Sequence, residues 1–361
     1  MHRLRRLRLA PLPDEATAHP FRFWTDYWAQ HPRHFAFVVG GLSALVSLIC
    51  LLQRGGYAGD FTWAWRAARL LIHGHNPYHD PGLSPIFPYP FDAPLFYPLP
   101  AVVVAAPFAL LPAWLGGPTF FGICAGTLAY LIARKQEWRL VPLLVSAPFY
   151  VAASVAQWSP LIVAAALAPA LAPLALAKPN LGIPVLLTHG NRRQWLRALY
   201  FVVLTLPLLP SWPLDWLHNL QHQSHYPMPL QVFPGIVLLL ALLRWHDPAA
   251  RLLLAMAIMP QRLWFYDQLP LWLMARSWRE GLFLTVFSWI GYWGWRLTPG
   301  DAVWKGTSPE MATGWIIGCI YLPALAVAFA PPILAWWRQR VLPLLLSAFL
   351  PTNWEPPAGE R

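Results

Sequence analysis

Long apolar runs recur along most of this chain and are separated by short clusters of basic residues. Of its 361 residues, 57% are hydrophobic and 11% are charged, whereas soluble domains carry about 25% charged residues. A water-soluble chain of this composition could not cover its own surface with polar groups. The sequence therefore predicts an all-α integral membrane protein.

The excess of basic residues supports the same conclusion. Lys and Arg total 26 against 15 Asp and Glu, which gives a formal net charge of +11. Because the basic residues lie between apolar runs, they indicate membrane topology rather than binding to nucleic acid. Cys50, Cys124 and Cys319 lie inside apolar runs without metal-ligand spacing, so we expect buried small side chains and no disulfide framework. The sequence contains no Asp-x-Asp motif that would indicate a divalent ion. We therefore expect neither a metal nor a cofactor.

The first span is expected at about residues 35–52, close to the roughly 20 residues that a bilayer core requires. Residues 1–34 form a basic tail without the features of a cleavable signal peptide, and we expect this tail in the cytoplasm. The chain then emerges on the non-cytoplasmic face and forms an outer loop over residues 54–112. The run 99–111 in this loop is short and proline-bracketed, so we interpret it as a re-entrant or interfacial helix. That interpretation leaves the basic cluster at 134–139 inside.

The remaining runs alternate across the membrane and give roughly ten crossings. We expect a polytopic transmembrane domain over residues 35–346 and a cytoplasmic tail over 347–361, with both termini inside. Residues 161–187 contain several prolines, so one pass or three short passes both satisfy the charges. The segment after Asp267 is also short for a span. Broken helices are tolerated at membrane depth where they line a cavity, so both regions are candidate walls of a site.

Asp60 lies at the mouth of the first span, directly after a glycine-rich turn. The residues that follow it predict a helix with Phe61, Trp65, Ala68 and Leu71 on one face, which suits an interfacial position. A carboxylate placed there can act as a base for a hydroxyl group presented from the aqueous side. The alternative is that Asp60 caps the helix, and the residue alone favours capping.

The outer loop also contains His73, His75, His79 and Asp80. These side chains could bind a metal ion, but their spacing matches no compact zinc pattern. Polar residues at the membrane interface explain them as well, and we favour that interpretation.

Lys178 is the only charged residue between Gln157 and Arg192. A cation in a bilayer is costly and usually marks a partner or a pathway, and a lipid phosphate is a natural anion for it. The alternative is a lysine that reaches from a helix end to the interface. Arg262 forms a second charged group with Tyr266 and Asp267, for which an Arg–Asp pair joining two helices is an equal alternative.

Three local patterns occur in a characteristic order. The first is Asp60-Phe61, an aromatic-Ala helix and Gly74-His75-Asn76-Pro77-Tyr78. The second runs from Tyr97-Pro98 through an apolar stretch to Leu110-Leu111-Pro112, and the third joins Gln157-Trp158-Ser159-Pro160 to Lys178-Pro179-Asn180. Together they resemble the GT-C superfamily of membrane glycosyltransferases, most of all glycosyltransferase family 87. Its characterised members are polyprenyl-phosphate-mannose-dependent mannosyltransferases and related enzymes. The resemblance covers about the first 190 residues.

The resemblance implies a GT-C-type transmembrane helix bundle in the cell membrane with interfacial helices in the first outer loop. It also implies an inverting glycosyltransferase of the cell envelope that works on the outer face. Asp60 would be the general base, and Lys178 and Arg262 would bind the phosphate of a polyprenyl-phosphate-linked sugar donor. The expected substrate-binding residues are Arg66, His75, Asn76, Tyr78, Tyr97, Gln157, Tyr266 and Asp267.

The expected partners are that donor, a lipid or glycan acceptor and membrane lipids, with no nucleic acid. The segment 259–267 lacks the paired histidines of the family's mannosyltransferases, so the sugar stays open between a hexose and a pentose. Loops 211–231 and 297–311 are expected to build the acceptor pocket. Two other classes are a lipid or sugar transporter and a non-catalytic scaffold. A scaffold predicts that Asp60 and Lys178 lie far apart.

Overall fold

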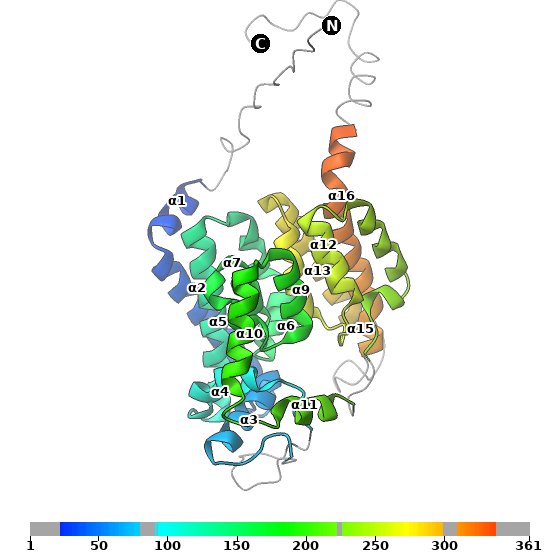
Figure 1. The fold of residues 1–361 in the computed structure, drawn as a ribbon. Coiled ribbons are helices and arrows are strands. Elements are labelled where there is room, and N and C mark those ends of the chain that lie inside the picture. Colours follow the sequence, from blue (N-terminus) through cyan, green and yellow to red (C-terminus); the bar gives the residue numbers. More distant parts are fainter. Residues whose placement is uncertain (1–21, 80–90, 92, 222–225, 299–308, 337–361) are drawn as a thin grey trace, which may run out of the picture.

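The computed structural model describes residues 22–79, 91, 93–221, 226–298 and 309–336. Every regular element in these residues is a helix, which confirms the all-α prediction for this part of the chain (Figure 1). The predicted cytoplasmic tails lie mostly outside the described residues, as do Asp80 and most of the loop 297–311. The helices are α1 (Arg22–Gln30), α2 (Pro32–Leu52), η2 (Gly59–Phe61), α3 (Thr62–Ile72), α4 (Leu99–Ala109), α5 (Ala113–Lys135), η3 (Trp138–Val145), α6 (Ala147–Ser154), α7 (Ser159–Leu167), η4 (Pro169–Leu171), α8 (Ala172–Ala175), α9 (Pro179–His189), α10 (Arg192–Thr205), α11 (Trp212–Gln221), η5 (Pro229–Gln231), η6 (Gly235–Arg244), α12 (Pro248–Ile258), η7 (Phe265–Met274), α13 (Trp278–Leu297), α15 (Pro309–Ile316), η8 (Ile317–Tyr321) and α16 (Leu322–Trp336).

Among the described residues, three helices are long and apolar enough to cross a membrane: Pro32–Leu52, Ala113–Lys135 and Ala312–Pro331. The first two are α2, which matches the span expected at 35–52, and α5, which covers the apolar run before the basic cluster at 134–139. They pack against each other where Gly40 faces Gly122 and Gly126. A Cβ atom on Gly40 would lie 2.8 Å from the carbonyl oxygen of Gly122. Small residues here allow the two backbones to approach closely, as is common between membrane helices.

Several other apolar segments are interrupted, whereas α13 is continuous over 20 residues. The segment 140–156 divides into η3 and α6, and the segment 161–187 divides into α7, η4, α8 and α9. The segment 161–187 is therefore not one continuous helix, and the cause is its prolines, which remove backbone donors and clash with the preceding turn. The break between α8 and α9 places Lys178 at the N-cap of α9.

Helix α4, expected to dip into the membrane rather than cross it, is short. Its 11 residues rise about 16 Å, roughly half of a bilayer core. It packs against α3, where Trp65 Nε1 and Arg69 donate hydrogen bonds to the carbonyl groups of Leu111 and Ala109. Most of α3 is buried, and Phe61, Trp65 and Ala68 of the predicted apolar face are buried too.

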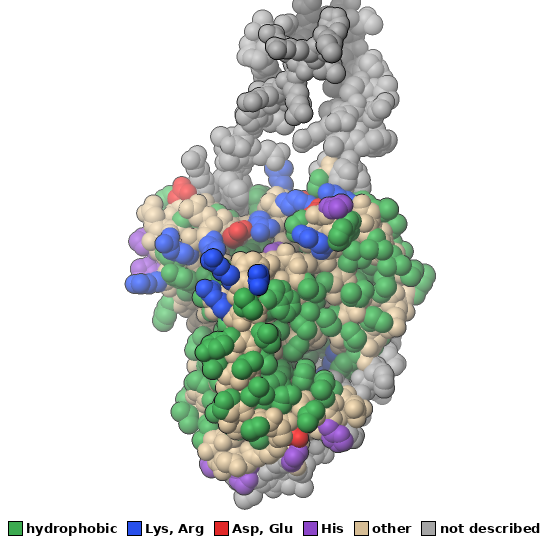
Figure 2. Space-filling model, viewed as in Figure 1, with side chains coloured by type: hydrophobic (Ala, Val, Ile, Leu, Met, Phe, Trp, Pro, Cys, Tyr) green, Lys and Arg blue, Asp and Glu red, His purple; other side chains and the backbone are tan. Residues whose placement is uncertain are grey.

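The surface divides into two polar ends and an apolar belt (Figure 2). Basic side chains gather at the end near α1 and the C-terminal part of α16, whereas the opposite end shows His side chains and no such basic cluster on this face. Arg244 and Arg276 both pair with Asp247 at the basic end, at 3.0 Å and 2.6 Å. Between the ends, α2, α10, η6 and α13 expose large apolar side chains. An apolar surface of this extent suits contact with lipid.

Candidate functional site

A cavity of about 390 Å³ lies among η2, α9, α11 and η7. Helices α3 and α11 lie at the end of the molecule opposite the basic end (Figure 1). Seven residues predicted for the site line this cavity: Asp60, Tyr97, Gln157, Lys178, Arg262, Tyr266 and Asp267. They come from segments more than 200 positions apart in the sequence, so the fold and not local sequence brings them together.

Two turns that hydrogen-bond to each other position Asp60. Its backbone N–H donates to the carbonyl oxygen of Val155 at 2.8 Å. Gly59 has φ +64, and a Cβ atom there would lie 2.6 Å from the same carbonyl oxygen, so this close approach requires glycine. Phe61 rather than Asp60 is the N-cap residue of α3. The carboxylate instead accepts a hydrogen bond from Gln157 Nε2 at 2.9 Å.

An aromatic cluster fixes the residues next to this pair. Phe61 stacks on Phe120 with ring centroids 4.1 Å apart, and Phe120 contacts Trp158 at 4.7 Å. All three side chains are buried. Because Phe61 follows Asp60 and Trp158 follows Gln157 in the chain, burial of this cluster holds both polar side chains in place.

Gln157 connects the carboxylate to the buried cation. Its Oε1 accepts hydrogen bonds from the Trp158 backbone N–H at 3.0 Å and from Lys178 Nζ at 2.9 Å. Both groups are donors only, so the amide oxygen must face them and the NH₂ group must face Asp60. The orientation of the amide thus follows from its partners. One carboxylate oxygen of Asp60 is occupied by Gln157.

Lys178 forms a buried ion pair with Asp267. Its Nζ lies 2.6 Å from Asp267 Oδ1, and the two side chains are 9% and 4% exposed. The ammonium group also lies 4.8 Å from the centroid of the Tyr266 ring. This placement differs from a lysine that reaches to the interface, because Lys178 points into the cavity and is held by three groups.

Arg262 and the N-terminal turn of α9 add to the positive side of the cavity. Arg262 lines the cavity, with its guanidinium carbon 5.9 Å from the Trp264 ring. Pro179 and Asn180, the first residues of α9, line it too. A helix N-terminus carries partial positive charge and free N–H groups, and favours an anion next to Lys178.

Four predicted substrate-binding residues do not line the cavity. Arg66 is buried over the Phe91 ring, and His75 is exposed. Asn76 and Tyr78 bind other parts of the chain, with Tyr78 donating its hydroxyl hydrogen to the Tyr97 carbonyl at 3.0 Å. Their roles in binding stay predictions. Of the histidines considered as metal ligands, His73 bonds to the Arg69 carbonyl and His79 to Asp215.

The cavity also has lining residues that the sequence prediction did not name as site residues. They are largely aromatic or apolar. Pro179, Asn180 and Ile183 belong to the segment 161–187, which was expected to form a wall, and Trp216, Leu220 and Tyr226 belong to the expected acceptor loop 211–231. The additional lining residues are Trp63, Phe96, Pro179, Asn180, Ile183, Trp216, Leu220, Tyr226, Met259 and Pro260.

No family model, no curated protein and no solved structure matches this chain. The assignment of a function therefore depends on the chemistry of the cavity and on the resemblance of the three sequence patterns.

Proposed function

We propose that this protein is an inverting glycosyltransferase that moves a hexose or pentose from a polyprenyl-phosphate-linked donor to a lipid or glycan acceptor. One observation carries the proposal: a carboxylate, Asp60, and a buried ammonium group, Lys178, lie in one cavity and are joined through Gln157. A scaffold protein has no need of this arrangement, and the scaffold hypothesis predicted that the two residues lie far apart.

The arrangement supplies the parts of a displacement reaction. Asp60 accepts the proton of the acceptor hydroxyl group, whose oxygen attacks the anomeric carbon of the donor sugar. The bond from that carbon to the phosphate oxygen breaks, and polyprenyl phosphate leaves with the electron pair. Lys178, Arg262 and the N-terminus of α9 stabilise the negative charge on this leaving group. Attack opposite the leaving group inverts the anomeric configuration.

We further propose a GT-C-type bundle of roughly ten crossings, with the cavity on the non-cytoplasmic face and both termini in the cytoplasm. The basic end shown in Figure 2 supports this orientation, because basic loops are retained in the cytoplasm. The cavity lies near α3 and α11, towards the opposite end.

The direct test is transfer of radiolabelled sugar from a set of polyprenyl-phosphate donors by the purified full-length protein in lipid nanodiscs. Product extraction and analysis of the anomeric configuration report the reaction. Donors that differ only in the sugar separate hexose from pentose transfer. Complete lack of transfer, together with movement of labelled lipid between leaflets in proteoliposomes, would instead support the alternative class, a lipid or sugar transporter.

Gln157→Leu is expected to lower kcat about 10²-fold, because misplacing a catalytic group by about 1 Å has an effect of this size. Without the amide, the Asp60 carboxylate loses the hydrogen bond that fixes one of its oxygens. The donor KM should change less than kcat. Gln30→Leu, on the exposed surface of α1, is the matched control. A kcat within about threefold of the unmodified protein would show that Gln157 does not position the base.

The proposed orientation predicts the labelling of two exposed positions. In a cysteine-free background, His75→Cys should react with a membrane-impermeant maleimide added to intact cells, and Arg193→Cys should react only after the membrane is opened. The reason is that His75 belongs to the outer loop and Arg193 to a basic cluster. The reverse pattern would place the cavity on the cytoplasmic side.

A further inference from the structure

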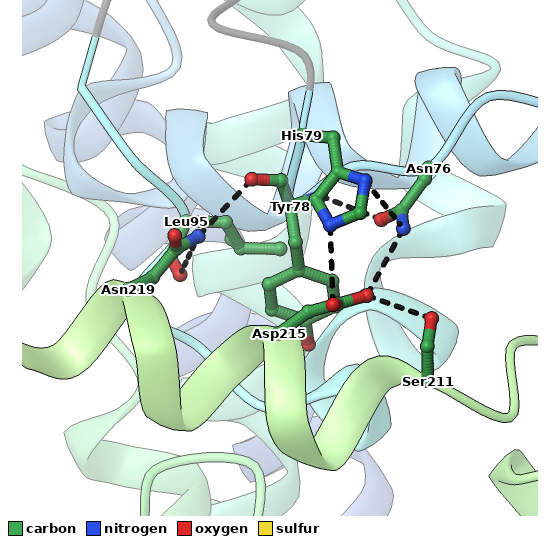
Figure 3. A network of polar contacts seen from close by, with 7 residues as sticks. All are labelled: Asn76, Tyr78, His79, Leu95, Ser211, Asp215 and Asn219. Carbon is green, nitrogen blue, oxygen red and sulfur yellow. Dashed lines mark hydrogen bonds and ion pairs between the residues drawn. The ribbon is translucent and has the colours of Figure 1, made fainter.

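Helix α11 forms a wall of the cavity and is hydrogen-bonded to the loop between α3 and α4. Trp216 and Leu220, four residues apart, line the cavity. Asp215 and Asn219, also four residues apart, face the loop between α3 and α4 (Figure 3). Residues four apart share one face of a helix, so Trp216 and Leu220 form one face of α11, and Asp215 and Asn219 form the face next to it.

Asp215 is the centre of this attachment. Its Oδ2 accepts hydrogen bonds from Asn76 Nδ2 at 3.0 Å and from Ser211 Oγ at 2.7 Å, and its Oδ1 lies 3.1 Å from His79 Nε2. The Tyr78 backbone N–H donates to Asn76 Oδ1 at 2.9 Å, which turns the NH₂ group of Asn76 towards Asp215.

The pKa of Asp215 agrees with this network. Burial alone would raise the pKa of this carboxyl group. The hydrogen bonds from Asn76, Ser211 and His79, with the charge of His79, outweigh burial and hold the pKa below its ordinary value. The carboxylate is therefore the stable form, and its acceptor oxygens are available to the loop.

Two further side chains of α11 attach to the same loop. Asn219 Nδ2 donates to the carbonyl oxygens of Tyr78 and Leu95, both at 3.3 Å, and Trp216 Nε1 donates to the Phe96 carbonyl at 2.9 Å. This loop begins after α3, which follows Asp60, and ends at Tyr97, which lines the cavity. Helix α11 is thus held to the loop between α3 and α4, and α3 directly follows the turn that contains the proposed base.

The wall faces the acceptor rather than the donor. The phosphate of a lipid-linked donor is expected at Lys178 and Arg262, and its lipid chain must remain in the membrane. Helix α11 belongs to an outer segment at the end opposite the basic end (Figure 1). It lines the same cavity as Asp60, where the acceptor hydroxyl group must arrive. The flat indole ring of Trp216 offers an apolar face to a sugar ring and a polar edge already bound to Phe96.

We propose that Asp215 is a positioning residue that holds α11 as the aqueous-side wall of the cavity, and that Trp216 on this wall contributes to selection of a sugar-containing acceptor. The second part depends on the proposed glycosyltransferase function, whereas the first part does not.

The first experiment measures the position of α11 without any assay of activity. Leu220→Cys places a thiol on the cavity side of α11 in a cysteine-free background. Asp215→Ala in that background should increase its rate of modification by a membrane-impermeant maleimide about tenfold, because the wall is released. His79→Ala, which removes one contact, should give a smaller increase. Leu214→Ala, a change at an exposed position of the same helix, should leave the rate unchanged. Equal rates in all four proteins would overturn the positioning role.

The second experiment measures transfer with varied acceptor and varied donor. Asp215→Ala and Trp216→Ala should each raise the acceptor KM about tenfold and leave the donor KM within about twofold, since they act on one substrate only. Increased labelling with an unchanged acceptor KM would overturn the role of Trp216 in acceptor selection, while the positioning role of Asp215 would stand. Increased labelling in a protein that transfers no sugar from any donor would overturn the glycosyltransferase function and, with it, the role of Trp216.

Discussion

Asp60→Asn is expected to abolish sugar transfer, with kcat lowered at least about 10³-fold, within the range that a general base contributes. The amide is nearly identical in shape and its oxygen can still accept the hydrogen bond from Gln157. It cannot accept the proton of an acceptor hydroxyl group. The cavity and the buried aromatic cluster around Phe61 should therefore persist while the chemical step is lost.

The measurement is single-turnover transfer of labelled sugar, with donor binding determined separately. Asp26→Asn on the exposed surface of α1 is the matched control, since it makes the same chemical change far from the cavity. We expect the control to keep full activity and the Asp60 variant to bind donor within about threefold of the unmodified protein. Full activity in Asp60→Asn would remove the base from the proposed mechanism.

Some cavity residues could be predicted from the sequence because they are charged residues next to or inside apolar segments, where charged residues are rare. Lys178 is the one charge in a long apolar stretch, and Asp60 follows the first span directly. Polar groups in a bilayer are costly, so each of these positions indicates a functional site even when the residue that it contacts cannot be identified from the sequence. Helices α2 and α5 could be predicted for a related reason, because runs of their length and composition have few alternatives to a membrane span.

The contacts between these residues could not be predicted, because they depend on how broken helices pack. Sequence proximity suggested a pair between Arg262 and Asp267, but nothing in the sequence suggested the ion pair that Asp267 forms with Lys178, 89 positions away. The proline break before α9 aims Lys178 at η7. Likewise His79 and Asp215 are 136 positions apart, and nothing in either neighbourhood indicates the other. Tertiary packing sets such pairs, and local pattern does not.

Lys178→Met is expected to impair both stability and transfer, for two separable reasons. Removal of one partner from a buried ion pair leaves an uncompensated charge on Asp267 and costs about 3–5 kcal/mol. It also removes the ammonium group proposed to stabilise the leaving phosphate. Thermal unfolding of the protein in detergent and transfer of labelled sugar should both show a loss, and a single variant cannot distinguish the two causes.

The double variant Lys178→Met with Asp267→Asn separates them. It leaves no buried charge at this position, and removal of both partners of a buried pair is often close to neutral for stability. We therefore expect the melting temperature to return most of the way to that of the unmodified protein, while transfer stays at least about 10²-fold reduced because the phosphate has lost a cation. Recovery of transfer together with stability would show that Lys178 acts only through its pair with Asp267, and Arg262 with the N-terminus of α9 would then be the phosphate site. The outcome depends on one physical distinction: a fold needs this charge only to be balanced, whereas a leaving phosphate needs it to be present.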